Sequence, residues 1–186
     1  MSDDGTKLAA VVKGGHIYTF SDSEANWTDR SGTGSAIVGD KHWYSIAMSD
    51  DGQELAAVVG GASGDGRHLY TATNSGADWT NRSTAAGSVS VIGGNRNWIS
   101  IAMSGNGEKL AAVVFGGHIY TSSDSGDSWT DRSTGTISGA KYWYSIAMSD
   151  NGERLAAVVF DGHIYTSSNS GAAWVDRSRA PSIGAP

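Results

Sequence analysis

The stretch Ser122-Ser123-Asp124-Ser125-Gly126-Asp127-Ser128-Trp129 occurs in four versions along the chain, and the rest of the sequence is spaced around them. It follows the strand-like segment 118–121 (His-Ile-Tyr-Thr), in which polar and apolar residues alternate. The other versions occupy 20–27, 72–79 and 167–174. Copies at regular intervals indicate a repeat architecture, in which each copy marks one structural unit.

Each repeat contains the same four segments in the same order. A Met-Ser-x-x-Gly turn is followed by Leu-Ala-Ala-Val-Val, then by His-(Ile/Leu)-Tyr-Thr, and then by Trp-(Thr/Val)-(Asp/Asn)-Arg. We expect a single domain over 1–186, with repeats at about 1–47, 48–102, 103–147 and 148–178 and a C-terminal tail at 179–186. The second repeat is the longest because its connections 60–67 and 83–97 are extended.

The segments of a repeat are predicted to be short β-strands. The segment 143–147 is rich in aromatic and branched residues, 155–159 is a small-residue apolar run, and 163–167 alternates polar and apolar residues. Gly and Asn turn signals separate them. Four antiparallel strands in about 45 residues are typical of a blade of a β-propeller. We therefore expect an all-β fold of about four four-stranded antiparallel blades.

One strand is missing from this pattern. The segment Trp-(Tyr/Ile)-Ser-Ile-Ala, which should form the inner strand of each blade, occurs only at 43–47, 98–102 and 143–147. The other three strands occur four times. The first blade is therefore expected to lack its inner strand unless the tail 179–186 supplies it, and the Pro residues of the tail would interrupt a ladder.

The pattern Ser-x-Asp-x-Gly-x-x-Trp resembles the Asp-box, or BNR repeat, which is found in sialidases, in Asp-box lectins and in photosystem II assembly factors of the Ycf48/Hcf136 type. The resemblance covers all four repeats. The residues that carry it are Asp22 and Trp27 in the first copy, Asn74, Gly76 and Trp79 in the second, Ser122, Asp124, Gly126 and Trp129 in the third, and Ser167, Asn169, Gly171 and Trp174 in the fourth.

The residue types of this turn favour a structural role. Asp or Asn at the third position accepts backbone hydrogen bonds, Gly at the fifth supplies a positive φ, and Trp at the eighth packs under the turn. Only the third copy matches the pattern in full. Phe20 and Glu24 replace Ser and Gly in the first copy, whose turn should therefore be the most strained.

The resemblance also has implications for assembly. Asp-box propellers usually have about six to eight blades, so four blades would form about half of an eight-bladed ring. Two blade faces and an unpaired strand would then be exposed, and such surfaces drive association. We expect a homodimer that completes the ring by blade–blade packing, and a compact four-bladed monomer is the alternative.

No unique catalytic constellation stands out. The histidines and arginines of the repeat recur once per blade, whereas an active site needs different residues from different blades; they are His16, His68, His118 and His163, and Arg30, Arg82, Arg132 and Arg177. A sialidase-like site also requires a Tyr nucleophile with a Glu partner and a separate Asp acid/base. We predict that the chain is not an enzyme and has no catalytic residue, cofactor or metal site.

Repeated aromatic residues of the inner strands are candidates for ligand binding, namely Trp43, Tyr44, Trp98, Trp143 and Tyr144. Sugars stack on such rings, but packing between blades is the favoured interpretation. The favoured function is a scaffold that binds a protein or a glycan. The alternatives are a degenerate sialidase-like glycoside hydrolase, a lectin fragment, or a part of a larger propeller.

Composition narrows the range of partners. A net charge of −6 and a pI near 5.2 give no general attraction for nucleic acid or anionic membranes. Cys is absent, which excludes disulfides and thiolate metal sites. Neither an apolar run of about 18 residues nor the apolar core of a signal peptide occurs. We expect a soluble protein with no nucleic-acid or membrane partner.

Overall fold

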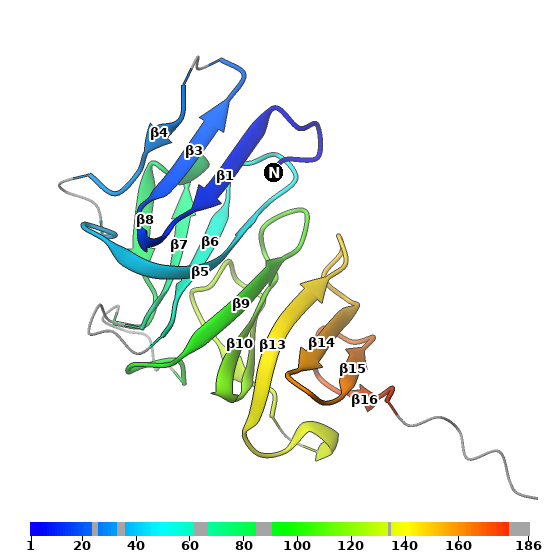
Figure 1. Ribbon diagram of the computed structural model, residues 1–186. Helices are drawn as coiled ribbons and strands as arrows, with labels where there is room; N and C mark the ends of the chain where they lie inside the picture. Colours follow the sequence, from blue (N-terminus) through cyan, green and yellow to red (C-terminus); the bar gives the residue numbers. More distant parts are fainter. Residues whose placement is uncertain (24–25, 33–35, 62–66, 85–90, 134, 179–186) are drawn as a thin grey trace, which may run out of the picture.

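The computed structural model describes residues 1–23, 26–32, 36–61, 67–84, 91–133 and 135–178, which form an all-β arc of four blades (Figure 1). Apart from two short 3-10 turns, η1 (Asn74–Gly76) and η2 (Gly135–Ile137), the regular structure in these ranges is β-strand. No helix in the described ranges has the length and apolar character needed to cross a bilayer. The predicted all-β propeller fold is confirmed.

Blades 2, 3 and 4 each have the four predicted strands. From inner to outer, blade 2 contains β5 (Lys41–Met48), β6 (Leu55–Val59), β7 (Leu69–Thr73) and β8 (Asp78–Asn81). In the same order, blade 3 contains β9 (Trp98–Met103), β10 (Leu110–Gly117), β11 (Ile119–Ser122) and β12 (Thr130–Asp131). Blade 4 contains β13 (Lys141–Met148), β14 (Leu155–Val159), β15 (Ile164–Ser167) and β16 (Val175–Asp176). Neighbouring strands are antiparallel, and in blade 2 Ala57 lies opposite both Ile46 and Tyr70.

Blade 1 is smaller. It contains β1 (Lys7–Val11), β3 (Ile17–Ser21) and β4 (Thr28–Asp29), and among the described residues no strand pairs with the inner edge of β1. The short strand β2 (Lys13–Gly15) pairs with β5 of blade 2. The predicted lack of an inner strand is thus confirmed for the described part of the chain. The tail 179–186 and the segments 62–66 and 85–90 of the extended connections lie outside the described residues.

Small side chains on the second strands let the blades stack face to face. Ala56 and Ala57 of β6 and Ala111 and Ala112 of β10 have no exposed surface. Apolar clusters fill the spaces between blades 1 and 2, blades 2 and 3, and blades 3 and 4. Alternate residues of one strand contribute to two of these clusters, because their side chains point to opposite faces of the sheet.

The turns between inner and second strands form a continuous hydrogen-bonded row. These inner turns comprise 2–5, 49–52, 104–107 and 149–152. The N–H of Asp3 donates to the carbonyl of Asp50, the N–H of Asp50 to Gly105, and the N–H of Gly105 to Asp150, each at 2.8 Å. The row holds the inner ends of successive blades together.

Candidate functional site

The turns between third and outer strands are held by side-chain hydrogen bonds in blades 3 and 4. We call the segments 20–27, 72–79, 122–129 and 167–174 the outer turns. Asp124 Oδ1 accepts hydrogen bonds from the Ser122 hydroxyl at 2.7 Å and from the Ser128 N–H at 2.9 Å. Gly126 has a φ of 89°, and its carbonyl accepts a 3.0 Å bond from the indole N–H of buried Trp129. Equivalent contacts in blade 4 involve Ser167, Asn169, Gly171 and Trp174.

The outer turns of blades 1 and 2 depart from this geometry. The Asn74 amide donates to Asp78 at 2.7 Å, and the indole N–H of buried Trp79 has no partner among the described residues, although Gly76 keeps its positive φ of 84°. In blade 1, exposed Trp27 packs on Phe20 with ring centroids 5.7 Å apart, and Asp22 is exposed. The strain expected at Glu24 falls outside the described residues.

Each of the last two outer turns packs on the third strand of the preceding blade. A Cβ at Gly126 would lie 2.8 Å from Thr71 Cγ2, and a Cβ at Gly171 would lie 3.0 Å from Thr121 Cγ2. The Thr71 hydroxyl in turn accepts a 2.6 Å bond from Arg82 Nε on the same blade. A hydrogen-bonded Thr–Arg pair therefore forms the surface against which the outer turn of the next blade packs.

Inner turns pack on the preceding blade in the same way. A Cβ at Gly52 would lie 2.5 Å from Lys7 Cδ, and a Cβ at Gly152 would lie 2.5 Å from Lys109 Cδ. The first inner turn differs, because a Cβ at Gly5 would meet nothing within 4 Å. A Cβ at Gly76 would lie 3.2 Å from Thr19 Cγ2, and a Cβ at Gly107 would lie 2.7 Å from Glu54 Cγ. Each internal interface thus has two glycine contacts, one near the inner turn and one near the outer turn.

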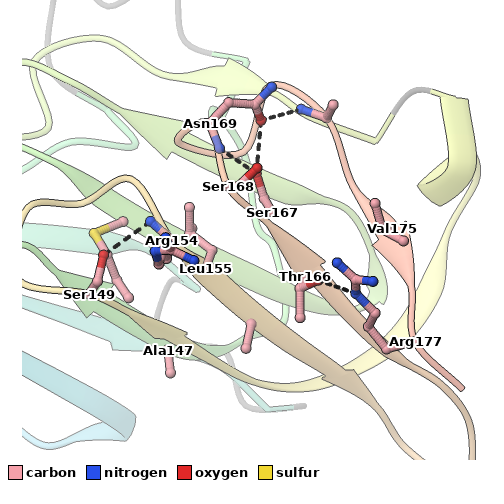
Figure 2. Close-up of a pocket in the computed structure, with 13 residues that line it drawn as sticks. Ala147, Ser149, Arg154, Leu155, Thr166, Ser167, Ser168, Asn169, Val175 and Arg177 are labelled. Carbon is pink, nitrogen blue, oxygen red and sulfur yellow. Dashed lines mark hydrogen bonds between the residues drawn. The ribbon is translucent and has the colours of Figure 1, made fainter.

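In blade 4 the two surfaces on which a following blade would rest its inner and outer turns are both uncovered. The Thr166 hydroxyl accepts a 2.9 Å bond from Arg177 Nε, and Arg154 occupies the repeat position of Lys7 and Lys109. Figure 2 shows these side chains along an open hollow of about 530 Å³ between the inner turn and the outer turn of the blade. Its apolar lining includes Ala147, Leu155 and Val175.

Side chains of this face are covered at the equivalent positions of blades 2 and 3. Ile164 is 50% exposed, whereas Leu69 and Ile119 are 0% exposed. Ala156 is likewise exposed, whereas the equivalent Ala111 is fully buried. The difference arises because the next blade covers these residues in blades 2 and 3.

Blade 1 has the opposite face uncovered. Val12 and Trp27 are each 48% exposed, whereas their counterparts Val59 and Trp79 are 1% and 7% exposed. Val59 and Trp79 belong to the cluster between blades 1 and 2. The arc therefore ends in two different faces, which have the chemistry of the two sides of each internal interface.

The aromatic residues singled out from the sequence do not converge on one site. Trp43, Trp98 and Trp143 are buried, and each packs against a Tyr of the third strand of its own blade with ring centroids 5.4–5.5 Å apart. A buried ring offers no face to a sugar. Tyr44 is partly buried against the cluster between blades 2 and 3, and Tyr144, on the open side of blade 4, is 57% exposed.

The repeated histidines pair within their own blades. The N–H of Ser31 holds the pKa of Asp29 below its ordinary value, and His16 lowers this pKa further against the opposing effect of burial. Among the described residues, no group of three or more His, Cys, Asp or Glu is placed to hold a metal ion. The Nδ1–Oδ2 distances are 2.6 Å for His16–Asp29, 2.6 Å for His118–Asp131 and 2.5 Å for His163–Asp176, and His68 contacts Asn81 at 3.0 Å.

Sequence reasoning did not single out individual residues of the open face of blade 4. The alternation in 163–167 already places Ile164 and Thr166 on one side of a strand. Their exposure depends on whether a further blade covers that side, which is a property of the assembly of repeats. The count of blades and strands therefore indicated that one face of the last blade would be open, but not which residues line it.

No protein-family model and no curated protein matches the chain. Its structure is similar to those of solved β-propellers. Ycf48 bound to a D1 peptide is 13% identical, with a TM-score of 0.56, and the match covers 92% of this chain and 44% of that chain. A chain of the nidogen–laminin complex is 11% identical, with a TM-score of 0.64, covering 95% of this chain and 60% of that chain.

The GH74 xyloglucanase from Xanthomonas campestris is 12% identical, with a TM-score of 0.61, and the match covers 94% of this chain and 28% of that enzyme. This chain therefore spans between 28% and 60% of the length of these three propellers. At such identities the likeness shows the propeller fold alone.

Proposed function

We propose that this chain is a non-catalytic propeller scaffold of the Asp-box type, that two copies complete one eight-bladed ring by blade–blade packing, and that the ring binds a protein or a glycan. The observation that carries the proposal is the pair of open end faces. Blade 4 presents the surface that blades 1 to 3 bury under the following blade, and blade 1 presents the surface that blades 2 to 4 bury against the preceding one.

The contacts of this dimer follow from those inside the chain. Gly5 of one copy would lie on Arg154 of the other, as Gly52 lies on Lys7. The exposed Ile164 would be covered by the open face of blade 1 of the other copy. A two-fold axis makes this interface twice, so both open faces of both copies are used and no further copy can add.

Two features support a scaffold without catalysis. The polar groups that could act as acids or bases recur in equivalent places, as the His–Asp pairs do, and each pair closes the outer strands of its own blade. Catalysis of hydrolysis requires unlike groups that converge on one bond. Two propeller neighbours are found in complexes, Ycf48 with a D1 peptide and nidogen with laminin, and these favour a binding role.

The mass of the purified chain in solution tests the assembly. Multi-angle light scattering should give twice the monomer mass of 19.3 kDa. Ile164→Asp should yield the monomer, because it places a charge in the apolar interface, and should weaken the dimer at least about a hundredfold. Val91→Asp is the matched control, since Val91 is an exposed apolar residue (42%) in the connection between blades 2 and 3, which are not terminal, and its variant should stay dimeric.

Other results contradict individual parts of the proposal. A wild-type monomer at micromolar concentration, or a trimer or larger ring, would exclude the eight-bladed dimer. Sustained turnover of a fluorogenic sialoside by the dimer would exclude a non-catalytic scaffold. Failure to bind any member of a glycan array and any peptide of an extended-peptide library would remove the binding role.

A further inference from the structure

The inner edge of β1 differs from the inner edges of the other second strands. The strands β6, β10 and β14 are each paired with an inner strand on one side and a third strand on the other. Among the described residues, β1 is paired only with β3. An unpaired strand edge is a template for the addition of another strand.

The backbone groups that face this edge can be identified. The N–H and carbonyl of Lys7 both bond to Ser2, at 2.9 Å each, on the side away from β3. The N–H of Val12 instead bonds to His16 on the side of the third strand, at 3.0 Å. Because alternate residues of a strand direct their polar groups to the same edge, Ala9 and Val11 direct theirs to the open edge.

A second, independent observation concerns a backbone N–H group of blade 2, that of Ile46, which lies at the same place. The N–H of Ile101 donates to the hydroxyl of Ser45, and the N–H of Ile146 donates to the hydroxyl of Ser100, both at 3.3 Å. Each bond joins the inner strand of one blade to the inner strand of the preceding blade. The equivalent N–H of Ile46 has no such partner in the described ranges, because the preceding inner strand is the one that blade 1 lacks.

The side chains around this slot lack the cover of an inner strand as well as that of a preceding blade. Ala10 is exposed, whereas the equivalent Ala57 is fully buried and lies opposite Ile46. Tyr18 on β3 is only half-buried, whereas the equivalent Tyr70 is buried under the edge of Trp43. An incoming strand with Trp and Ile at these positions would cover Tyr18 and Ala10.

We propose that the inner edge of blade 1 is a strand acceptor, which binds an extended peptide of the pattern Trp-x-Ser-Ile-Ala antiparallel to β1. The register of blade 2 places the peptide Ala opposite Ala9, its Ile opposite Ala10 and its Ser opposite Val11. The peptide Ser hydroxyl accepts the N–H of Ile46, and the peptide Trp packs on Tyr18. The ladder of this site uses the strand edge of one copy, whereas the peptide Trp and Ile would lie on the open face of blade 1, as Trp43 and Ile46 lie in the cluster between blades 1 and 2.

A synthetic peptide tests the proposal on the wild-type chain. The probe is the sequence of β13, Lys-Tyr-Trp-Tyr-Ser-Ile-Ala-Met, with a solubilising lysine tail and a fluorophore. We expect saturable binding by anisotropy, and amide hydrogen exchange slowed at least about tenfold at Ala9, Val11 and Ile46. The matched control peptide carries N-methyl groups on Ser and Ala, which removes the ladder donors opposite Val11 and Ala9, and should bind at least about tenfold more weakly.

The outcomes separate this site from the ring interface. The Ile164→Asp variant should still bind the peptide even where it no longer dimerises, because the ladder lies on blade 1. The proposal is overturned if the peptide does not saturate at millimolar concentration, if the N-methylated peptide binds equally well, or if protection appears on β14 and β15 instead of β1. A monomeric wild type that binds the peptide with the expected protection would refute the ring and retain the acceptor.

Discussion

The carboxyl groups of Asp50 and Asp150, which belong to inner turns two blades apart, meet above the backbone of Gly105. A Cβ at Gly105 would lie 2.2 Å from Asp50 Oδ2 and 1.9 Å from Asp150 Oδ1. The hydrogen-bonding contact with Asp150 is the main cause of a pKa of Asp50 above its ordinary value of 3.8. The third inner turn has Gly where the others have Asp, and a third carboxylate would have no room there.

Replacement of Asp50 by Asn should stabilise the protein near neutral pH. A raised pKa in the folded state means that folding is favoured while Asp50 is protonated, and this advantage is lost as the pH rises through the raised value. The amide introduced by Asp50→Asn cannot ionise, so the gain over wild type should be largest at about pH 7 and should disappear near pH 3. Urea unfolding at both pH values measures this gain in the free energy of unfolding.

Asp51→Asn is the matched control, one residue away on the same turn. The Ser49 hydroxyl is the main cause of a lowered pKa of Asp51, so its ionised form stabilises the fold above about pH 4. Asn106 and Asn151 accept the same bond in blades 3 and 4 at 2.8 Å each. The control should therefore lose less than about 1 kcal/mol at pH 7 and gain nothing. A loss of stability in Asp50→Asn at pH 7 would refute the unfavourable contact between the carboxyl groups of Asp50 and Asp150.

Gly126→Ala should destabilise the protein more than a positive φ alone explains. The new Cβ would lie 2.8 Å from Thr71 Cγ2 and 3.2 Å from Leu110 Cδ1, so blades 2 and 3 would be forced apart. Gly139→Ala is the comparison, because Gly139 has a φ of 79° and a Cβ there meets nothing within 4 Å. We expect about 1–2 kcal/mol for Gly139→Ala and about 1–3 kcal/mol more for Gly126→Ala by urea unfolding. Equal losses would show that the glycine contact carries no interface energy.

Trp143→Phe should cost more than Trp98→Phe, although both rings are fully buried. The indole N–H of Trp143 donates to the carbonyl of Gly117 at 3.1 Å, whereas that of Trp98 has no partner among the described residues. Both variants lose similar ring area, and only Trp143→Phe also breaks a hydrogen bond. We expect a difference of about 1 kcal/mol in the free energy of unfolding, measured by urea titration. A larger loss for Trp98→Phe would indicate that its N–H is in fact bonded.

The strand pattern and the repeat count predict the fold because both are local properties of the chain. The alternation in 163–167 and the apolar run in 155–159 become β15 and β14, and the glycine of the outer turn has the positive φ that its position requires. Less expected is the left-handed backbone at Ser125 and Ser170, with φ of 55° and 53°. Ser has no special tolerance for that conformation, so the neighbouring turn contacts must stabilise it.

Contacts that join different repeats are harder to predict. A repeated Trp marks an equivalent position in each unit, but whether its ring faces a ligand or a neighbouring blade depends on the stacking of units, as the burial of Trp43 illustrates. The meeting of Asp50 with Asp150 involves three consecutive blades and cannot be derived from one of them. The open face around Ile164 likewise follows from the arrangement of the blades rather than from the sequence of β15.

Asp124 provides a test of the structural role assigned to the outer turn. Burial acts to raise the pKa of Asp124, but hydrogen bonds from Ser128 and Ser122 outweigh this effect and lower it overall. Asp124→Asn keeps the acceptor, as Asn169 does when it accepts the Ala173 N–H at 2.8 Å, and should change stability by less than about 0.5 kcal/mol at pH 7. Asp124→Ala leaves the Ser128 N–H and the Ser122 hydroxyl without their acceptor and should cost about 1–2 kcal/mol in urea unfolding. Because a lowered pKa stabilises the fold only while the group is ionised, the gap between Asp124→Ala and wild type should narrow as the pH falls below about 4. If both variants lost the same amount, the negative charge rather than the acceptor geometry would be what the turn requires, and the Asn residues of blades 2 and 4 would then mark weaker turns.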